Sequence, residues 1–141
     1  MSRRKVGFGF VTLVVTCSLS LAVACGGKSD DEIEAELAAK KQTVNTAAVG
    51  KAKEIFTTRC TPCHGAEGRG DGSASASLNP KPRDFHDLEW QKSVTDDHIM
   101  NIIKVGGAGV GKSAAMPSNP DIQDKAVLAA LKDHIRALGK P

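Results

Sequence analysis

Apolar residues recur three and four positions apart in three segments of the chain, a spacing typical of amphipathic helices. The predicted helices cover residues 47–58, 95–104 and 121–138. The apolar positions that share a face are Ala48, Ala52, Ile55 and Phe56 in the first helix, Ile99, Ile102 and Ile103 in the second, and Val127, Leu131, His134 and Leu138 in the third. These faces are the candidate core of the protein.

Residues that favour helix ends stand at the borders of these segments. Asn45 or Thr46 can cap the first helix, and Thr95 can cap the second, where the acidic residues that follow it are favourable in the first turn. Gly139 follows the last apolar position and predicts the end of the third helix.

The first 25 residues have a different pattern, because a long uncharged stretch follows a cluster of positive charge. Three basic residues at positions 3 to 5 precede Val6–Ala24, which contains no charged residue, as in a secretory signal. The same stretch is long enough to be an uncleaved transmembrane anchor. The small residues that lead to Cys25 resemble the lipobox of bacterial lipoproteins, which implies a signal peptide over residues 1–24 and lipid modification of Cys25. Both interpretations place the rest of the chain outside the cytoplasm and attached to a membrane.

Residues 25–45 predict a flexible, acidic tether. Glycine and serine follow Cys25, and residues 30–36 carry five acidic side chains. Residues 32–41 are rich in Ala, Glu and Lys and favour a short solvated helix, but they contain too few apolar residues to pack by themselves. We expect this segment to hold the domain away from the bilayer.

The charge of the chain belongs largely to its N-terminus. The sequence contains 19 Lys and Arg against 16 Asp and Glu, and three of the basic residues lie in the first five positions. The part from Cys25 onward is therefore close to neutral. Phosphate binding needs a clustered positive excess, so we expect no nucleic-acid partner.

Two of the four cysteines lie in a motif with a specific chemistry. Cys17 belongs to the signal segment and Cys25 is the lipidation candidate, which leaves Cys60 and Cys63 in the sequence Cys-Thr-Pro-Cys-His. CxxCH is the attachment signature of c-type haem. Its two thiols form thioethers with the haem vinyl groups, and the adjacent histidine, here His64, is held beneath the iron.

Three other uses of this cysteine pair fit the sequence less well. A thioredoxin-type redox pair needs a βαβ context, and no strand-period apolar run follows the motif. A zinc site needs a second pair of ligands, and His86 and His98 do not have finger or knuckle spacing. A disulfide between cysteines this close would be strained and would leave His64 unexplained.

On these residues the chain resembles the class I, single-haem c-type cytochromes over residues 46–141. The resemblance implies an all-α fold, the small cytochrome c fold, in which three to four helices surround one haem. It implies that this haem c is covalently bound through Cys60 and Cys63 and that His64 is one axial ligand of its iron.

The resemblance also implies a second axial ligand from a late, irregular loop. Met116 lies 52 residues after His64 in a segment bounded by glycine and proline, and Pro117 follows it as in the Met-Pro motif of the family. Met100 is the rival methionine, but it lies inside a predicted helix beside isoleucines. His86 and His98 are the rival histidines; both are flanked by acidic residues, which predicts that they are solvated.

Two stretches between the motif and the second helix carry further expectations. Residues 65–72 contain four glycines without the strand or the GKS/GKT ending of a phosphate loop, and we expect them to let the backbone pass close to the porphyrin. Residues 80–85, Pro-Lys-Pro-Arg-Asp-Phe, resemble a stretch of many bacterial single-haem cytochromes. The resemblance implies a backbone carbonyl here that accepts the ring N–H of His64. Arg83 is a candidate partner of a haem propionate or of Asp84.

The candidate core has two unusual features. His134 stands on the apolar face of the last helix, where the family commonly has an aromatic residue, and we expect it to be packed and hydrogen-bonded. Residues 46–141 contain only 21 large apolar residues, which is thin for a helical domain and favours a cofactor-filled interior.

These expectations predict an electron-transfer protein rather than an enzyme. With His64 and Met116 both on iron, no position is free for a small-molecule substrate. We expect a carrier on the periplasmic side of the inner or the outer membrane, held by its lipid, whose partners are redox proteins of respiratory complexes. The alternatives are a haem-bearing subunit of a larger oxidoreductase complex, an open-site haem enzyme or gas sensor, and a non-haem interaction domain.

Overall fold

The computed structural model describes residues 28–140, and these residues form helices and loops without a β-strand. The all-α prediction is confirmed. The α-helices are α1 (Asp30–Ile55), α2 (Thr61–His64), α3 (Leu88–Ser93), α4 (Asp96–Val105) and α5 (Lys125–Leu138). A π-helical turn, Phe56–Cys60, joins α1 to α2, and the two 3-10 turns are Ser75–Ser77 and Ala108–Val110. The predicted signal peptide and Cys25 lie outside the described residues.

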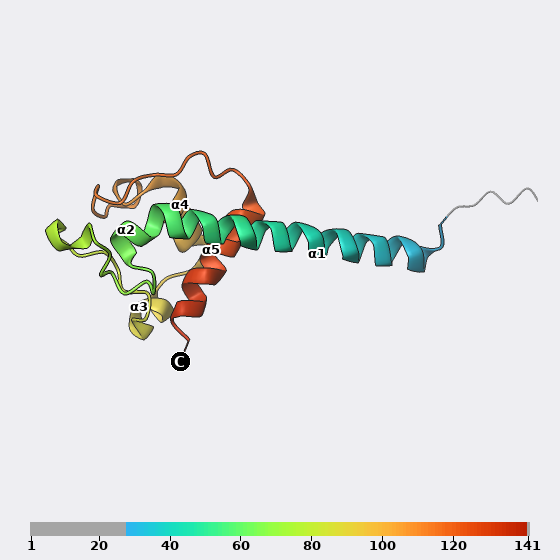
Figure 1. Ribbon diagram of the computed structural model, residues 1–141, viewed down its shortest axis with the longest axis horizontal. Coiled ribbons are helices and arrows are strands. Elements are labelled where there is room, and N and C mark those ends of the chain that lie inside the picture. The colour runs from blue at the N-terminus through green and yellow to red at the C-terminus, as the bar shows by residue number, and fades with distance from the viewer. Residues whose placement is uncertain (1–27, 141) are drawn as a thin grey trace, which may run out of the picture.

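Helix α1 is much longer than the sequence pattern predicted. It begins after Ser29, whose side chain and that of Glu32 form a reciprocal capping box. The predicted start at residue 47 with an N-cap at Asn45 or Thr46 is wrong, because the Thr46 hydroxyl donates to the Gln42 carbonyl inside the helix (3.0 Å) instead of capping a new helix. Residues 30–47 of α1 are exposed and project from the body of the molecule (Figure 1), and we call this part the stalk. No helix within residues 28–140 is long and apolar enough to cross a membrane.

The C-terminal half of α1 packs against α5 and forms the main helix pair of the body. Ala48 and Ala52 are buried on α1, and Ala130 is buried on α5, so the two backbones approach closely. Helix α5 begins four residues later than predicted, because the Asp124 side chain accepts from the Ala126 N–H (2.7 Å) and caps it there. It ends at Gly139, where a side chain would lie 2.6 Å from Gln91.

Helix α4 matches its prediction closely. The Thr95 side chain accepts from the His98 N–H (3.1 Å), as expected for the N-cap. Ile99 of α4 and Leu131 of α5 are both only 1% exposed, which makes them the centre of the core. Helix α3, which the sequence pattern did not predict, is capped by Asp87 and lies against the C-terminal end of α5 through Gln91.

Candidate functional site

The CxxCH motif lies at the junction of the π-helical turn and α2. Cys60 ends the turn and Cys63 lies in α2, so one helical turn separates the two free thiols. Burial raises the pKa of the Cys60 thiol to about 11, which keeps it protonated at neutral pH. Both cysteines line the same cavity.

His64, the last residue of α2, is held from two directions. Its Nδ1 lies 3.1 Å from the carbonyl oxygen of Arg83, so the proton on Nδ1 is donated there. This contact confirms the expected carbonyl within residues 80–85 and leaves Nε2 free to bind a metal. The ring of Phe85 stacks on the imidazole with 4.5 Å between ring centroids and 16° between planes. Burial lowers the pKa of His64, while the Arg83 carbonyl opposes that shift.

A cavity of about 290 Å³ contains the predicted haem residues. Its size is at the lower end of the range for small-molecule and cofactor sites. Cys60, Cys63, His64 and Met116 all line it, and most of the remaining wall is apolar. Its apolar lining residues include Phe56, Leu78, Phe85, Trp90, Ile99, Ile102, Ile103, Leu131 and Ile135.

The structure places the two rival methionines in different surroundings. Met116 lines the cavity, whereas Met100 packs against the hydrophobic core. The prediction that His86 and His98 are both solvated is wrong. His86 is half-buried and its Nε2 lies 2.7 Å from the Glu67 carbonyl oxygen, and His98 is half-buried and lines the cavity.

The loop that carries Met116 is fastened to the end of α4. The Gly107 N–H donates to the Met116 carbonyl (3.0 Å), and Asn119 donates from its backbone to Lys104 (3.0 Å) and from its side chain to Ile103 (2.9 Å). A side chain at Gly107 would collide with the Ser113 carbonyl. The irregular loop therefore has a defined conformation around Met116.

The charged residues of the cavity wall are all basic. Arg59, Lys81, Arg83 and Lys112 line it, and within residues 28–140 no Asp or Glu does. Arg83 pairs with Asp87 (3.2 Å) and not with Asp84, so the Asp84 alternative is wrong. An apolar wall with basic groups at its border suits a flat apolar ring with anionic side groups, and the two thiols and His64 suit its attachment and ligation. The residues present therefore fit haem c.

The glycines of residues 65–72 have a different role from the predicted one. They do not line the cavity in the part of the chain that is described. Gly70 has a φ of +75°, and a side chain there would collide with the Pro82 carbonyl; a side chain at Gly72 would collide with the Thr61 and Pro62 carbonyls. These glycines let the loop pass close to α2 and to residues 82–83, and so support the His64 environment from outside.

His134 is packed as expected but lacks the expected hydrogen bond. Its ring meets Phe56 edge-on with 4.3 Å between centroids. Its Nε2 is buried and has no hydrogen-bond partner among residues 28–140. Burial lowers the pKa of His134, and the positive charge of Lys53 lowers it further.

Several cavity residues were not found from the sequence. The stacking of Phe85 on His64 and the presence of Arg59, His98 and Lys112 in the wall depend on contacts between distant segments. The one available signal was the position of Phe85 at the end of the Pro-Lys-Pro-Arg-Asp-Phe stretch.

The fold and the site together define a class of protein, a small helical domain built around a covalently attached haem. Comparison with protein families agrees: the sequence model of the cytochrome c family matches residues 49–139. The chain belongs to the cytochrome c family, whose members carry haem c on cysteines and transfer electrons. No curated protein matches the chain at a significant level of similarity.

Proposed function

We propose that the protein is a one-electron carrier in which His64 and Met116 are the two axial ligands of the haem iron. The observation that carries this proposal is that both side chains, from elements far apart in sequence, line one cavity with the two attachment cysteines. When bound, haem c supplies a one-electron couple, and Met/His ligation raises its potential relative to ligation by two histidines. Because the chain fills both axial positions, we propose no enzymatic reaction.

The surroundings of the two ligands support a rigid site. The Arg83 carbonyl holds the proton of His64 on Nδ1, and the contacts of Gly107 and Asn119 hold the Met116 loop on α4. Side chains that are already in position need little rearrangement when the charge of the site changes, which favours fast electron transfer.

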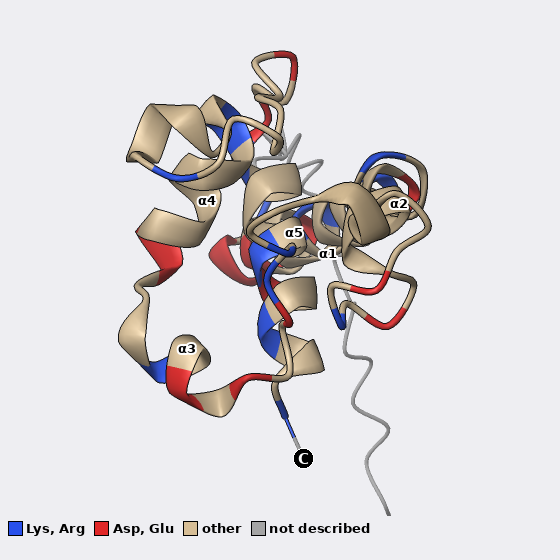
Figure 2. Ribbon diagram, turned by 90° about the vertical axis from the view of Figure 1, so that its left-hand side faces the viewer, with Lys and Arg blue, Asp and Glu red and all other residues tan. Residues whose placement is uncertain are grey.

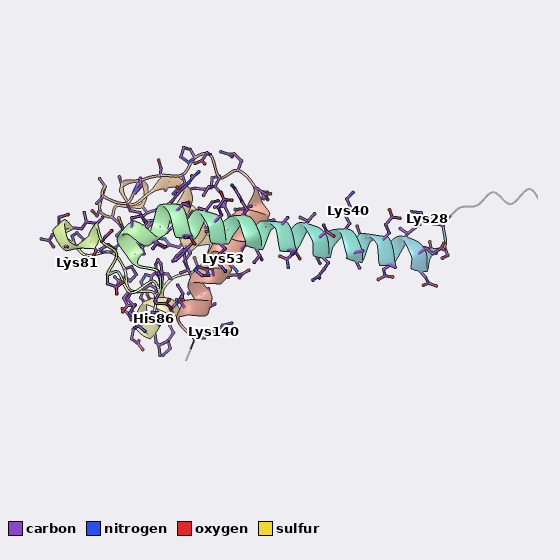
Figure 3. All side chains as sticks on the ribbon, in the orientation of Figure 1. Lys28, Lys40, Lys53, Lys81, His86 and Lys140 are labelled. Carbon is purple, nitrogen blue, oxygen red and sulfur yellow. The ribbon has the colours of Figure 1, made fainter. Side chains whose placement is uncertain are left out.

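We also propose that the domain is exported and held on a bacterial membrane by lipid on Cys25, facing the periplasm. The stalk supports this arrangement, since its 18 helical residues (30–47) span about 27 Å at a rise of about 1.5 Å per residue. Lys81, which lines the cavity, lies at the opposite end of the molecule from Lys28 at the base of the stalk (Figure 3). The cavity would then face away from the bilayer.

The partners we propose are redox proteins, namely a quinol-oxidising or dehydrogenase complex as donor and a terminal oxidase or reductase as acceptor. Figure 2 shows the body from the end opposite the stalk, and basic and acidic residues are intermixed along its chain. Such a surface favours transient docking close to the haem over strong electrostatic binding.

One observation supports a second candidate. His98 lines the same cavity as Met116, so histidine ligation, or an iron with an open position, is the alternative that the site itself offers. An open position would make the protein a haem enzyme or gas sensor.

Absorption spectra of the holoprotein distinguish these candidates. We expect the weak far-red sulfur-to-iron band in the oxidised wild type, its loss in Met116→Ala, and its retention in Met100→Ala, the matched control. Reduced wild type should bind CO slowly, whereas the Met116→Ala variant should bind it rapidly. A wild type without the band, or one that binds CO rapidly, would contradict the proposed ligation.

A further inference from the structure

The orientation of the His64 ring is determined by one short segment, residues 83–85. The Arg83 carbonyl accepts the Nδ1 proton at 3.1 Å, and two residues later Phe85 places its ring parallel to the imidazole. The hydrogen bond specifies which nitrogen of His64 remains free, but it allows the imidazole ring to tilt. The stacked Phe85 ring, with 4.5 Å between ring centroids, prevents such a tilt, because a tilted imidazole would push its edge into the face of Phe85.

Phe85 is itself held firmly. Its side chain is 6% exposed, and a side chain on Gly68 would lie 2.8 Å from its ring. Its N–H donates to the Gly68 carbonyl (2.8 Å), and its carbonyl accepts from the side-chain amide of Gln91 (2.8 Å). Phe85 therefore has little freedom to follow a movement of the His64 ring.

Gln91 connects this segment to helix α5. The same amide nitrogen that donates to Phe85 also donates to the Ile135 carbonyl (2.9 Å), and Arg136 donates to the Gln91 side-chain oxygen (2.9 Å). The position of the Phe85 backbone is thus defined by the C-terminal helix.

We propose that Phe85 is a positioning residue that fixes the plane of the His64 imidazole, and that Gln91 acts through Phe85. This inference rests on the proposed ligation of iron by His64. The plane of an axial imidazole determines how its π orbitals overlap with those of the metal, so its orientation affects the magnetic anisotropy of the oxidised site as well as its potential.

Phe56 provides a matched control. It is as buried as Phe85 (4% against 6% exposed) and lines the same cavity, but its ring lies 6.5 Å from that of Phe85 and its edge contact is with His134. Truncation of either phenylalanine removes similar apolar volume, whereas only truncation of Phe85 removes the stack on His64.

The test is low-temperature electron paramagnetic resonance of the oxidised holoproteins, together with their reduction potentials. We expect shifted and broadened g values and a shifted potential in Phe85→Leu, wild-type g values in Phe85→Tyr, and wild-type g values in Phe56→Leu despite its lower melting temperature. Gln91→Met keeps the side-chain length but loses the hydrogen bonds that Gln91 donates to the Phe85 and Ile135 carbonyls. This variant should shift the g values in the same direction as Phe85→Leu, by a smaller amount. If Phe85→Leu fails to load haem, Gln91→Met tests the positioning role instead.

Two results would overturn the positioning role. The first is a Phe85→Leu variant with wild-type g values or, if that variant carries no haem, a Gln91→Met variant with wild-type g values. The second is a shift of the g values in Phe56→Leu that is as large as the shift in Phe85→Leu. A high-spin spectrum of the wild type is a different outcome, since it would contradict the axial ligation itself and with it the inference that depends on it.

Discussion

The unpaired nitrogen of His134 predicts that the protein can be stabilised at this position. Nε2 is buried without a hydrogen-bond partner within residues 28–140, while the ring makes a favourable edge contact with Phe56 (4.3 Å). His134→Phe keeps an aromatic ring in this place and removes the unpaired nitrogen. A buried polar group without a partner costs about 1–3 kcal/mol. Because the rest of the ring is partly exposed, we expect a gain at the lower end, about 1 kcal/mol, or roughly 4–8 °C in melting temperature for a domain of this size.

The effect of His134 depends on pH, and its sign follows from the direction of the pKa shift. Burial and Lys53 lower the pKa of His134 in the folded protein. The unfolded chain therefore binds this proton more readily, and the free energy of unfolding decreases as the pH falls through the unfolded-state value of about 6.5. The decrease continues until the pH lies below the folded-state pKa. The stability advantage of His134→Phe should accordingly grow between pH 8 and pH 5.

Denaturant unfolding of the holoproteins at several pH values measures both effects. His134→Gln is the control, because it keeps a polar group at this position but does not titrate; it should remove the pH dependence without the gain at pH 8. All carboxylates and the remaining histidines are the same in the three proteins, so their contributions cancel when the unfolding free energies are subtracted. If His134→Phe is less stable than the wild type at pH 8, and the difference does not change down to pH 5, the nitrogen is satisfied and our reasoning is wrong.

Three further predictions concern the helices and the glycine loop. Arg136→Leu should lower the unfolding free energy by about 2 kcal/mol in denaturant titrations, since two main-chain carbonyls, of Gln91 and Val94, lose a charged donor; an unchanged midpoint would contradict this. Gly50→Ala should raise the melting temperature, because, apart from its chain neighbours and the backbone of its own helix, no described atom lies within 4 Å of the added carbon, and alanine is favoured over glycine in helices by up to about 1 kcal/mol. Gly70→Ala, in contrast, should lower the melting temperature and weaken haem incorporation. Ala38→Pro, in the exposed stalk, should reduce the helical circular dichroism signal but leave the melting temperature of the haem domain unchanged; a lower melting temperature would show that the stalk contributes to the core.

The features that the sequence predicted correctly have local causes. Helix α4 carries its own N-cap at Thr95 and its own apolar stripe, and the attachment motif is contiguous. Helix α5 starts later than predicted because Asp124 is its N-cap. Asp121 also precedes the apolar face, but its carboxylate pairs with Arg59 (2.8 Å). A choice of this kind depends on a residue that is distant in sequence, which no local pattern contains.

The start of α1 and the support of His64 could not be predicted for a related reason. The stalk is helical although all of its residues are exposed, because a capping box and a run of good helix formers favour the helix. Apolar periodicity detects only helices that bury a face. The stacked ring of Phe85 and its link through Gln91 to Ile135 join three segments. The Pro-Lys-Pro-Arg-Asp-Phe stretch draws attention to Phe85, but the sequence contexts of Gln91 and Ile135 carry no such signal.

The cavity explains why so few large apolar residues suffice in this domain. Left without a cofactor, the largely apolar cavity of about 290 Å³ would leave its apolar wall without packing partners, which destabilises the fold. Ile99 and Leu131, the most buried side chains, both contribute to the cavity wall, so the core and the haem site share residues. The helices therefore depend on the cofactor for a large part of their interior, and attachment at Cys60 and Cys63 makes that part of the core permanent.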